Sequence, residues 1–273
     1  MNEKNWRKMK MNFQNEINSD IKFLAKSEIR LKILSELYEG PSNVRGLVNK
    51  TKITYSSVSS NISKLEQNDH IEKIDNKYHI NPMSEIYFRT LMDFKNSVDL
   101  ITDFNDFWDE HNLSQLSMDC IMNITDLKDS QLIETTPIDI YKTHNTIKSQ
   151  LLESNSIKAI FPYLHPEYPQ LIEHILKNNG YVELLIPRSL YKAIMSSIND
   201  RIRKNASKKG NLIVYPIKNE LKIYLTICDK SMSLGLFKND GSFDQNRILI
   251  SDSEKSQEWA ENLFENIKHD VIK

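Results

Sequence analysis

The stretch TYSSVSSNISKLEQNDHIEKIDNKYHI, from Thr54 to Ile80, decides the fold of the N-terminal part of the chain. Its apolar residues Val58, Ile62 and Leu65 recur at helical spacing, which predicts a helix that starts at Thr54 and packs one face inward. The Thr54 hydroxyl is expected to accept a hydrogen bond from an amide of the first turn. The opposite face is rich in serine, and short polar side chains allow close approach to the major groove of DNA.

The outward side chains of this helix are the first candidates for contact with DNA, because hydroxyl and ammonium groups bond phosphate oxygens and base edges. The candidate DNA-binding residues on the helix are Tyr55, Ser56, Ser57, Ser59, Ser60, Ser63 and Lys64. A plain solvated helix face would have the same composition, so the flanking sequence has to decide between the two interpretations.

The flanking sequence favours a winged helix-turn-helix. Ser27 is expected to cap a helix that ends at Gly40-Pro41, and a second short helix around Leu47 leads through residues 50–53 into the recognition helix. Beyond it, residues 72–75 and 77–80 predict two short strands around the tight turn Asp75-Asn76. The resulting wing carries three further candidate DNA-binding residues, Lys73, Asn76 and Lys77.

The composition is that of an ordinary soluble protein with room for two domains. The chain has 273 residues, of which 39% are hydrophobic and 27% charged. No uncharged run exceeds residues 53–63, which is too short to cross a bilayer, and the N-terminus lacks the apolar core of a signal peptide. We therefore expect a cytoplasmic protein without a membrane partner. Cys120 and Cys228 are isolated in the sequence, and we expect them to be buried side chains rather than a redox pair.

Charge is divided unevenly along the chain. Residues 1–82 carry 14 Lys and Arg against 10 Asp and Glu, whereas residues 83–273 carry 22 against 27. The positive part is the part with the winged helix, as expected if this domain meets the phosphates of double-stranded DNA. Because the excess is small, useful affinity would need two recognition helices in a homodimer.

Three segments are expected: a winged helix-turn-helix domain at residues 1–82, a connecting helix at 83–112, and an α/β domain at 113–273. The connecting helix runs from Pro82 to about His111. Its apolar stripe could pack against a second subunit or against the protein's own second domain, and for Phe107 and Trp108 the second domain is favoured. The stripe consists of Tyr87, Leu91, Phe94, Val98, Ile101, Phe104 and Trp108.

The second domain is predicted to be an α/β sandwich with a mixed sheet, so the expected fold class is mixed α+β. Helices are predicted at residues 139–152, 167–177 and 189–206, with strands at 157–161 and 182–186 between them. Four strands without helical interruption then follow at 212–217, 221–228, 233–237 and 247–250, before a final amphipathic helix around Trp259. Alternating elements followed by a run of strands are typical of such a sandwich.

No catalytic motif was found. The six glycines are too far apart for a phosphate-binding loop, and neither a nucleophile elbow nor a zinc-protease motif occurs. The seven histidines are scattered; His165 and His174 could face one cleft, but we expect no metal, no cofactor and no enzymatic activity.

One aromatic loop, at residues 161–169, follows a predicted strand, where crevices of α/β sheets form. Tyr163, His165 and Tyr168 are candidates to line a small-molecule pocket, and Arg188 is a candidate to hold an anion there. The alternative is a proline-stiffened loop whose rings cap the core.

Five stretches carry a resemblance to a known family. They are FLAKSEIRLKILSELYEGP, TYSSVSSNISKLEQNDHI, NDFWDEHNLSQL, FPYLHPEYP and LGLFKNDGSFDQNRILISDSEKSQEWAENLF. The chain resembles predicted archaeal transcriptional regulators of methanogens, which join an N-terminal winged helix to the middle domain of the methanogenesis regulatory protein. The resemblance implies a DNA-binding regulator with a sensory or dimerising C-terminal domain.

The hypothesis from the sequence is a homodimeric transcriptional regulator whose second domain senses a small effector. Two alternatives remain open. The winged helix could dock another transcription protein through its uncharged serine face, or the His165 loop could serve a small-molecule enzyme, which the missing motifs disfavour.

Overall fold

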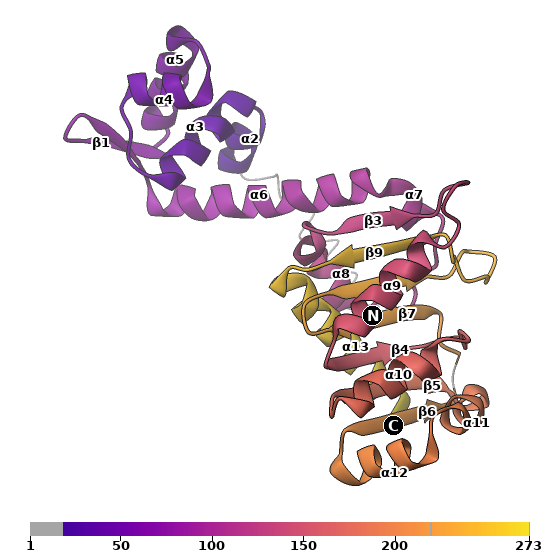
Figure 1. Cartoon of the computed structure of the whole chain (residues 1–273). Helices are drawn as coiled ribbons and strands as arrows, with labels where there is room; N and C mark the ends of the chain where they lie inside the picture. Colours follow the sequence, from indigo (N-terminus) through magenta and orange to yellow (C-terminus); the bar gives the residue numbers. More distant parts are fainter. Residues whose placement is uncertain (1–18, 219, 273) are drawn as a thin grey trace, which may run out of the picture. The chain divides into compact units, whose positions relative to one another are not determined.

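The computed structural model describes residues 19–218 and 220–272 (Figure 1). The chain divides into two compact units, Met1–Lys95 and Asn96–Lys273. Each unit has hydrophobic side chains gathered into cores of its own.

The N-terminal unit is a winged helix-turn-helix. Its helices are α2 (Ser19–Ala25), α3 (Glu28–Glu39), α4 (Val44–Thr51), α5 (Tyr55–Gln67) and the first part of α6 (Pro82–Asp103). Strands β1 (Ile71–Ile74) and β2 (Lys77–Ile80) pair antiparallel and form the wing. The core buries Ile33, Leu34, Leu47, Val58 and Leu65, of which Val58 and Leu65 are inward positions predicted from helical spacing.

Local signals set the ends of these elements. The Arg30 amide donates to Ser27 Oγ at 3.3 Å, so Ser27 caps α3 as expected. Asp75 and Asn76 both have positive φ, 47° and 63°, which is the backbone of the two-residue turn predicted for the wing. The expected cap by Thr54 is wrong: its hydroxyl donates to Ser57 Oγ at 2.9 Å and caps no amide of α5.

Helix α6 differs from the prediction in length and in packing. It ends at Asp103, and a separate short helix, α7 (Asn105–Asp109), follows. The break lets the chain turn and bury Phe107 and Trp108 in the C-terminal unit, as favoured from the sequence; the Trp108 indole donates to Leu100 O at 3.3 Å.

The predicted stripe of α6 and α7 is therefore divided among three environments. Tyr87 and Leu91 pack on the winged-helix core, a partner that the prediction did not include. Phe104 packs on the core of the C-terminal unit, with Trp108. The large hydrophobic side chains of α6 that remain exposed are Met83, Ile86, Phe94, Val98 and Ile101.

The C-terminal unit is built on one seven-stranded mixed sheet, which confirms the predicted fold class. The strands are β3 (Gln131–Glu134), β4 (Ser156–Ile160), β5 (Tyr181–Pro187), β6 (Leu212–Ile217), β7 (Ile223–Cys228), β8 (Met232–Leu236) and β9 (Arg247–Ser251). Their order is β3-β9-β8-β7-β4-β5-β6. Strands β4, β5 and β6 run parallel, whereas the remaining pairs are antiparallel.

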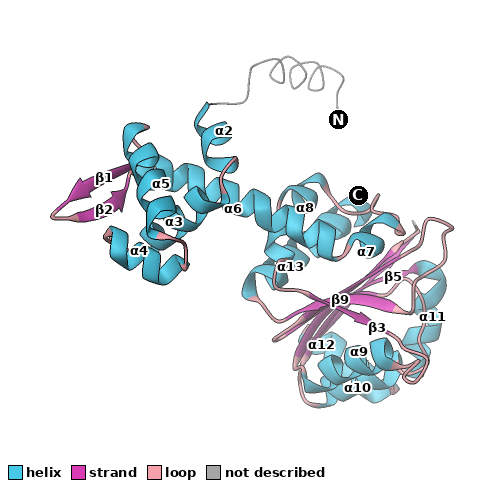
Figure 2. Cartoon of the chain, turned by 90° about the horizontal axis from the view of Figure 1, so that it is seen from above, coloured by secondary structure: helices cyan, strands magenta, loops and turns pink. Residues whose placement is uncertain are grey.

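Helices cover both faces of this sheet (Figure 2). One face packs on α13 (Glu254–Ile272), α8 (Met118–Met122) and the 3-10 turn Ile124–Leu127, with Trp259 and Phe264 in the core. The other face packs on α9 (Lys142–Glu153), α10 (Tyr168–Lys177), α11 (Arg188–Ser197) and α12 (Asp200–Lys209). The continuous helix predicted over 189–206 is wrong, because Asn199 caps α12 by accepting from the amides of Arg201 and Ile202. Strand β3 was not predicted.

None of the helices within residues 19–218 and 220–272 combines the length and the apolarity that crossing a bilayer requires.

Candidate functional site

The outward face of α5 carries the helix candidates for DNA contact. Tyr55 is 58% exposed, and Ser56, Ser60, Ser63 and Lys64 are also exposed. Ser57 and Ser59 are half-buried, so they lie at the border of this face. We call the five exposed residues the recognition face.

Some polar groups of the recognition face make hydrogen bonds within the protein, and others do not. Ser63 Oγ donates to Ser59 O at 3.1 Å, within the helix. In the described part of the chain, the side chains of Ser60 and Lys64 have no recorded hydrogen bond or ion pair. Both are therefore available to a partner in solution.

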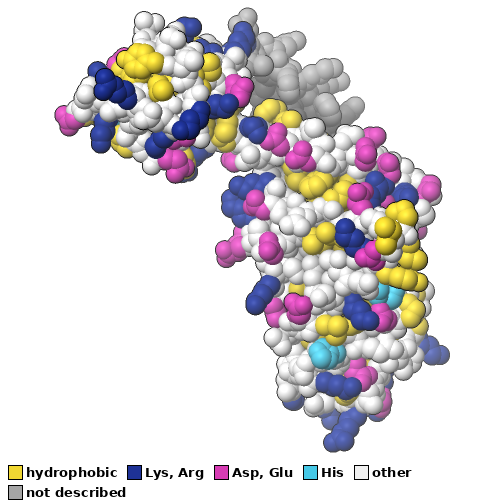
Figure 3. Space-filling model, turned by 45° about the horizontal axis from the view of Figure 1, so that its top comes forward, with side chains coloured by type: hydrophobic (Ala, Val, Ile, Leu, Met, Phe, Trp, Pro, Cys, Tyr) yellow, Lys and Arg dark blue, Asp and Glu magenta, His cyan; other side chains and the backbone are white. Residues whose placement is uncertain are grey.

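The wing presents its three candidates to solvent. Lys73, Asn76 and Lys77 are exposed, and Lys73 Nζ lies 5.6 Å from the centroid of the Tyr78 ring. Figure 3 shows that Lys and Arg side chains of the N-terminal unit alternate with acidic ones on the visible face. On this face the unit therefore offers separate positive charges rather than one continuous basic patch.

The C-terminal unit contains a cavity of about 310 Å³ at the C-terminal end of β4. Three segments line it: α9 with the residues before it, the loop between β4 and α10, and the segment from the end of β8 into β9. The lining residues are Ile140, Tyr141, Thr143, His144, Ile147, Tyr163, Leu164, His165, Pro166, Phe243, Gln245, Asn246 and Ile248. Polar and apolar side chains line it in similar measure, and a concave site with convergent polar groups is a candidate for binding a small molecule.

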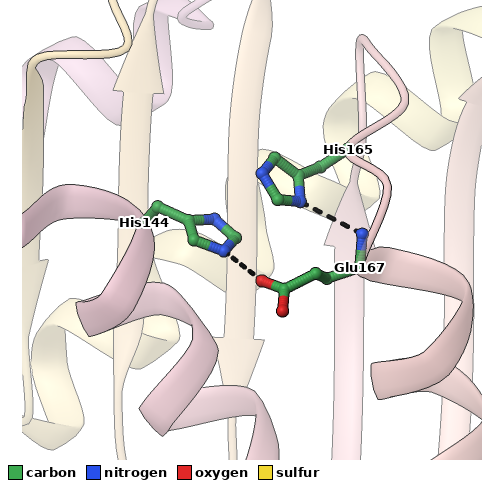
Figure 4. Close-up of side chains that lie close together, drawn as sticks. All are labelled: His144, His165 and Glu167. Carbon is green, nitrogen blue, oxygen red and sulfur yellow. Dashed lines mark hydrogen bonds and ion pairs between the residues drawn. The ribbon is translucent and has the colours of Figure 1, made fainter. Parts of the chain in front are cut away.

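Two histidines and a glutamate meet at the edge of this cavity (Figure 4). His144 Nε2 lies 2.5 Å from Glu167 Oε2, and Lys148 Nζ lies 2.6 Å from Glu167 Oε1. The rings of His144 and His165 stack, with their centroids 3.8 Å apart. Lys148 and His144 lower the pKa of Glu167 to about 2, so this carboxylate is ionised at neutral pH.

Tyr163, which lines the cavity, packs on two buried tyrosine rings. Tyr163 and Tyr168 share a hydrogen bond between their hydroxyls at 3.2 Å, and Tyr224 lies beside both rings. Burial raises the pKa of Tyr163, and that of Tyr168 and Tyr224 further. The three hydroxyls therefore stay protonated at physiological pH.

The structure places the four candidate ligand residues differently. Tyr163 and His165 line the cavity, and Tyr168 lies behind Tyr163 and is buried. Arg188, at the start of α11, is not among the lining residues. His174 is exposed and neighbours Asn178, and it is not among the residues that line the cavity with His165.

The sequence did not predict a role for His144, whose ring stacks on that of His165. Its signal was weak: His144 and Lys148 stand four residues apart, so a helix places both on one face, toward Glu167. The loop that contains Glu167 was recognised, but not the helix that faces it.

A buried polar network ties the cavity wall to the end of α7. Asp244, between the cavity residues Phe243 and Gln245, accepts from Arg247 Nε at 2.8 Å and contacts His111 Nε2 at 3.1 Å. Burial opposes ionisation of Asp244, but the Asn246 amide and Arg247 outweigh it and lower the pKa of this carboxyl.

Two family models match the chain. Residues 140–270 match the middle domain of the methanogenesis regulatory protein FilR1, and residues 18–103 match the HVO_A0261 N-terminal domain. The first match contains every residue that lines the cavity, and the second contains the winged helix and ends with α6.

The methanogenesis regulatory protein FilR1 of Methanothrix harundinacea (strain 6Ac) is 23% identical over 248 residues. The match covers 90% of this chain but only 56% of the relative, so the chain spans about half of that protein's length. This relative is named as a regulatory protein.

The solved structures are more distant. TrmBL2, described as an archaeal chromatin protein with a novel mode of DNA binding, aligns with a TM-score of 0.41 and 10% identity, over 92% of this chain and 97% of its own. An IclR-type transcriptional regulator from Alicyclobacillus acidocaldarius aligns with a TM-score of 0.24 and 10% identity, over 92% and 96%.

The sequence comparisons confirm the resemblance expected from the sequence. Residues 140–270 are similar to the FilR1 middle domain, and residues 18–103 are similar to the HVO_A0261 N-terminal domain.

Proposed function

We propose that the chain is a transcriptional regulator that binds double-stranded DNA through the recognition face of α5. The main support for this proposal is that Ser60 and Lys64 project outward from the third helix of a helix-turn-helix. The neighbouring wing has two exposed lysines. This placement is the one that winged helices use to reach the major groove with a helix and the backbone with the wing. The match to a regulatory protein over 90% of the chain supports the same class.

We further propose that the regulator is a homodimer. The exposed apolar residues of α6 recur at steps of three, four, seven and eight, so they lie on one face of that helix. A second copy of the helix would cover this face. The dimer would also supply two recognition helices, which the modest positive charge of the N-terminal unit calls for.

The cavity is the proposed site of a small-molecule effector. Its wall includes Phe243, Gln245 and Asn246, and the intervening Asp244 is bonded to His111 at the end of α7. A ligand that moves this wall would therefore act on the helix that follows α6. Such a ligand shifts the equilibrium only as far as it binds one arrangement better than the other.

The test is DNA binding by the full chain to fragments of its own promoter and of neighbouring genes, measured over a range of salt concentrations. Wild-type protein should bind specifically and lose affinity steeply as salt rises, because lysines displace counterions from phosphates. The double variant Ser60→Glu with Lys64→Glu should lose binding while its melting temperature stays nearly constant.

A matched control makes the same charge change elsewhere. Lys192 and Ser196 are exposed on α11 and have the same spacing as Ser60 and Lys64, so Lys192→Glu with Ser196→Glu should bind DNA as the wild type does. Equal affinity of both double variants would disprove the assignment of α5. Retention of a protein partner without salt-sensitive DNA binding would instead favour a docking module.

A further inference from the structure

His144, His165 and Glu167 form a cluster that the proposed DNA contacts do not use. His144 comes from α9, whereas His165 and Glu167 come from the loop before α10. One ligand atom from each residue can be chosen so that all three lie within 4.8 Å of one another. Among the described residues this is the group of histidine and acidic side chains with metal-ligand geometry.

The stacked rings of His144 and His165, with centroids 3.8 Å apart, bring both imidazoles within reach of one ion. A ring nitrogen of each histidine lies within 4.8 Å of the Glu167 carboxylate. A neutral imidazole is the ligand form of histidine.

The Glu167 carboxylate is held in an orientation that suits a metal ligand. Lys148 holds Glu167 Oε1 at 2.6 Å, and the other oxygen, Oε2, points at His144. Groups that hydrogen-bond a ligand in this way fix its orientation toward a metal ion. The His144 and Glu167 side chains are 19% and 41% exposed, so an ion can enter from solvent.

We propose that His144, His165 and Glu167 bind a divalent transition-metal ion of the Zn²⁺ class. The ion takes the place of the proton between His144 Nε2 and Glu167 Oε2. Two nitrogens and one carboxylate oxygen suit Zn²⁺, Co²⁺ or Ni²⁺, whereas Mg²⁺ and Ca²⁺ prefer oxygen ligands throughout. Binding requires His165 to give up the long hydrogen bond of 3.2 Å from the Glu167 amide to its Nδ1.

A site with three protein ligands leaves a further coordination position for water or a small molecule. His144 and His165 both line the cavity of about 310 Å³, so this position would face it. The ion would thereby give the cavity a preference for ligands with a metal-binding donor group. The metal site itself does not depend on the DNA-binding proposal.

The experiment is a titration of the full-length protein with Co²⁺ after treatment with a chelator, followed by visible absorption and by displacement with Zn²⁺. We expect one ion per chain, with the absorption of a cobalt ion bound by nitrogen and oxygen. His144→Ala, His165→Ala and Glu167→Gln should each weaken binding by more than about 100-fold. His174→Ala, which removes an exposed histidine of α10, should leave binding unchanged.

The melting temperature of each chelated variant tests whether it is folded, and His144→Gln replaces His144→Ala if the latter unfolds. The proposal is overturned if the wild-type protein binds no stoichiometric ion, or if folded variants of His144 and His165 bind it as tightly as the wild type. Because no DNA is present, either outcome leaves the DNA-binding proposal to its own test.

Discussion

His111 Nε2 and Asp244 Oδ2 lie 3.1 Å apart, although the two residues are separated by 133 positions in the sequence. Both side chains are almost fully buried, and His111 Nδ1 also contacts Phe107 O at 2.5 Å. Glu110 and Asp244 both pair with Arg247, so the contact is one part of a network. The network joins the end of α7 to the segment between β8 and β9.

Replacing Asp244 should destabilise the C-terminal unit strongly. Asp244→Ala would leave Arg247 and the buried His111 without their shared acceptor, and breaking a buried charged pair in this way costs about 3–5 kcal/mol. Asp240→Ala is the matched control in the same segment, because Asp240 is exposed and bonds only Ser242 among the described residues. Denaturant unfolding checks the difference, and equal losses for the two variants would contradict it.

The N-terminal unit should lose stability in acid because of His70. Its ring stacks on Phe23, its Nδ1 lies 2.8 Å from Ser84 Oγ, and its buried Nε2 has no hydrogen-bond partner in the described part of the chain. Burial, with a smaller contribution from Arg30, lowers the pKa of His70 against the opposing effect of Asp20 and Asp69.

Since the folded state holds this proton less tightly than the unfolded state, the stabilisation is complete above the unfolded pKa of about 6.5 and is lost as pH falls below it. Hydrogen-exchange protection of amides in α3 and α5, corrected for the intrinsic effect of pH, should decrease over that range. His70→Gln should flatten the dependence, whereas His79→Gln, on the wing, should keep it. If the hydrogen-exchange protection of His70→Gln depended on pH as steeply as that of the wild type, this assignment would be refuted.

The exposed face of α6 should control dimer formation. Ile101 is 48% exposed, and a charge at this position would have to be buried in the proposed dimer. Ile101→Glu should therefore be monomeric by sedimentation at concentrations where the wild type is dimeric, with an unchanged circular dichroism spectrum. Thr102→Glu places the same charge on an adjacent face and should remain dimeric; a dimeric Ile101→Glu would argue against this seam.

The two cysteines should be unreactive in the folded protein. Cys120 and Cys228 are only 1% and 5% exposed. Burial raises the pKa of Cys228 to about 11 and also raises that of Cys120. Because the thiolate is the reactive form, a thiol reagent at neutral pH should label native protein at least about 100-fold more slowly than unfolded protein. Rapid labelling of native protein would reopen a redox role.

The sequence by itself determined the elements that depend on neighbours in the chain. The helix that contains Val58, Ile62 and Leu65 was set by spacing, and the wing by a two-residue turn at Asp75-Asn76. These signals act within a few residues, so they can be read without knowing the fold. The alternation of helices and strands likewise indicated a mixed sheet.

Only the tertiary structure decided which distant segments meet. It ended α6 at Asp103 because Phe107 and Trp108 find their core in the C-terminal unit, although the apolar spacing continues past that point. It also brought His144 to His165 and His111 to Asp244, through packing of a helix or loop against another segment. Spacing along the chain cannot show such contacts, because they arise when separate elements bury their apolar faces together.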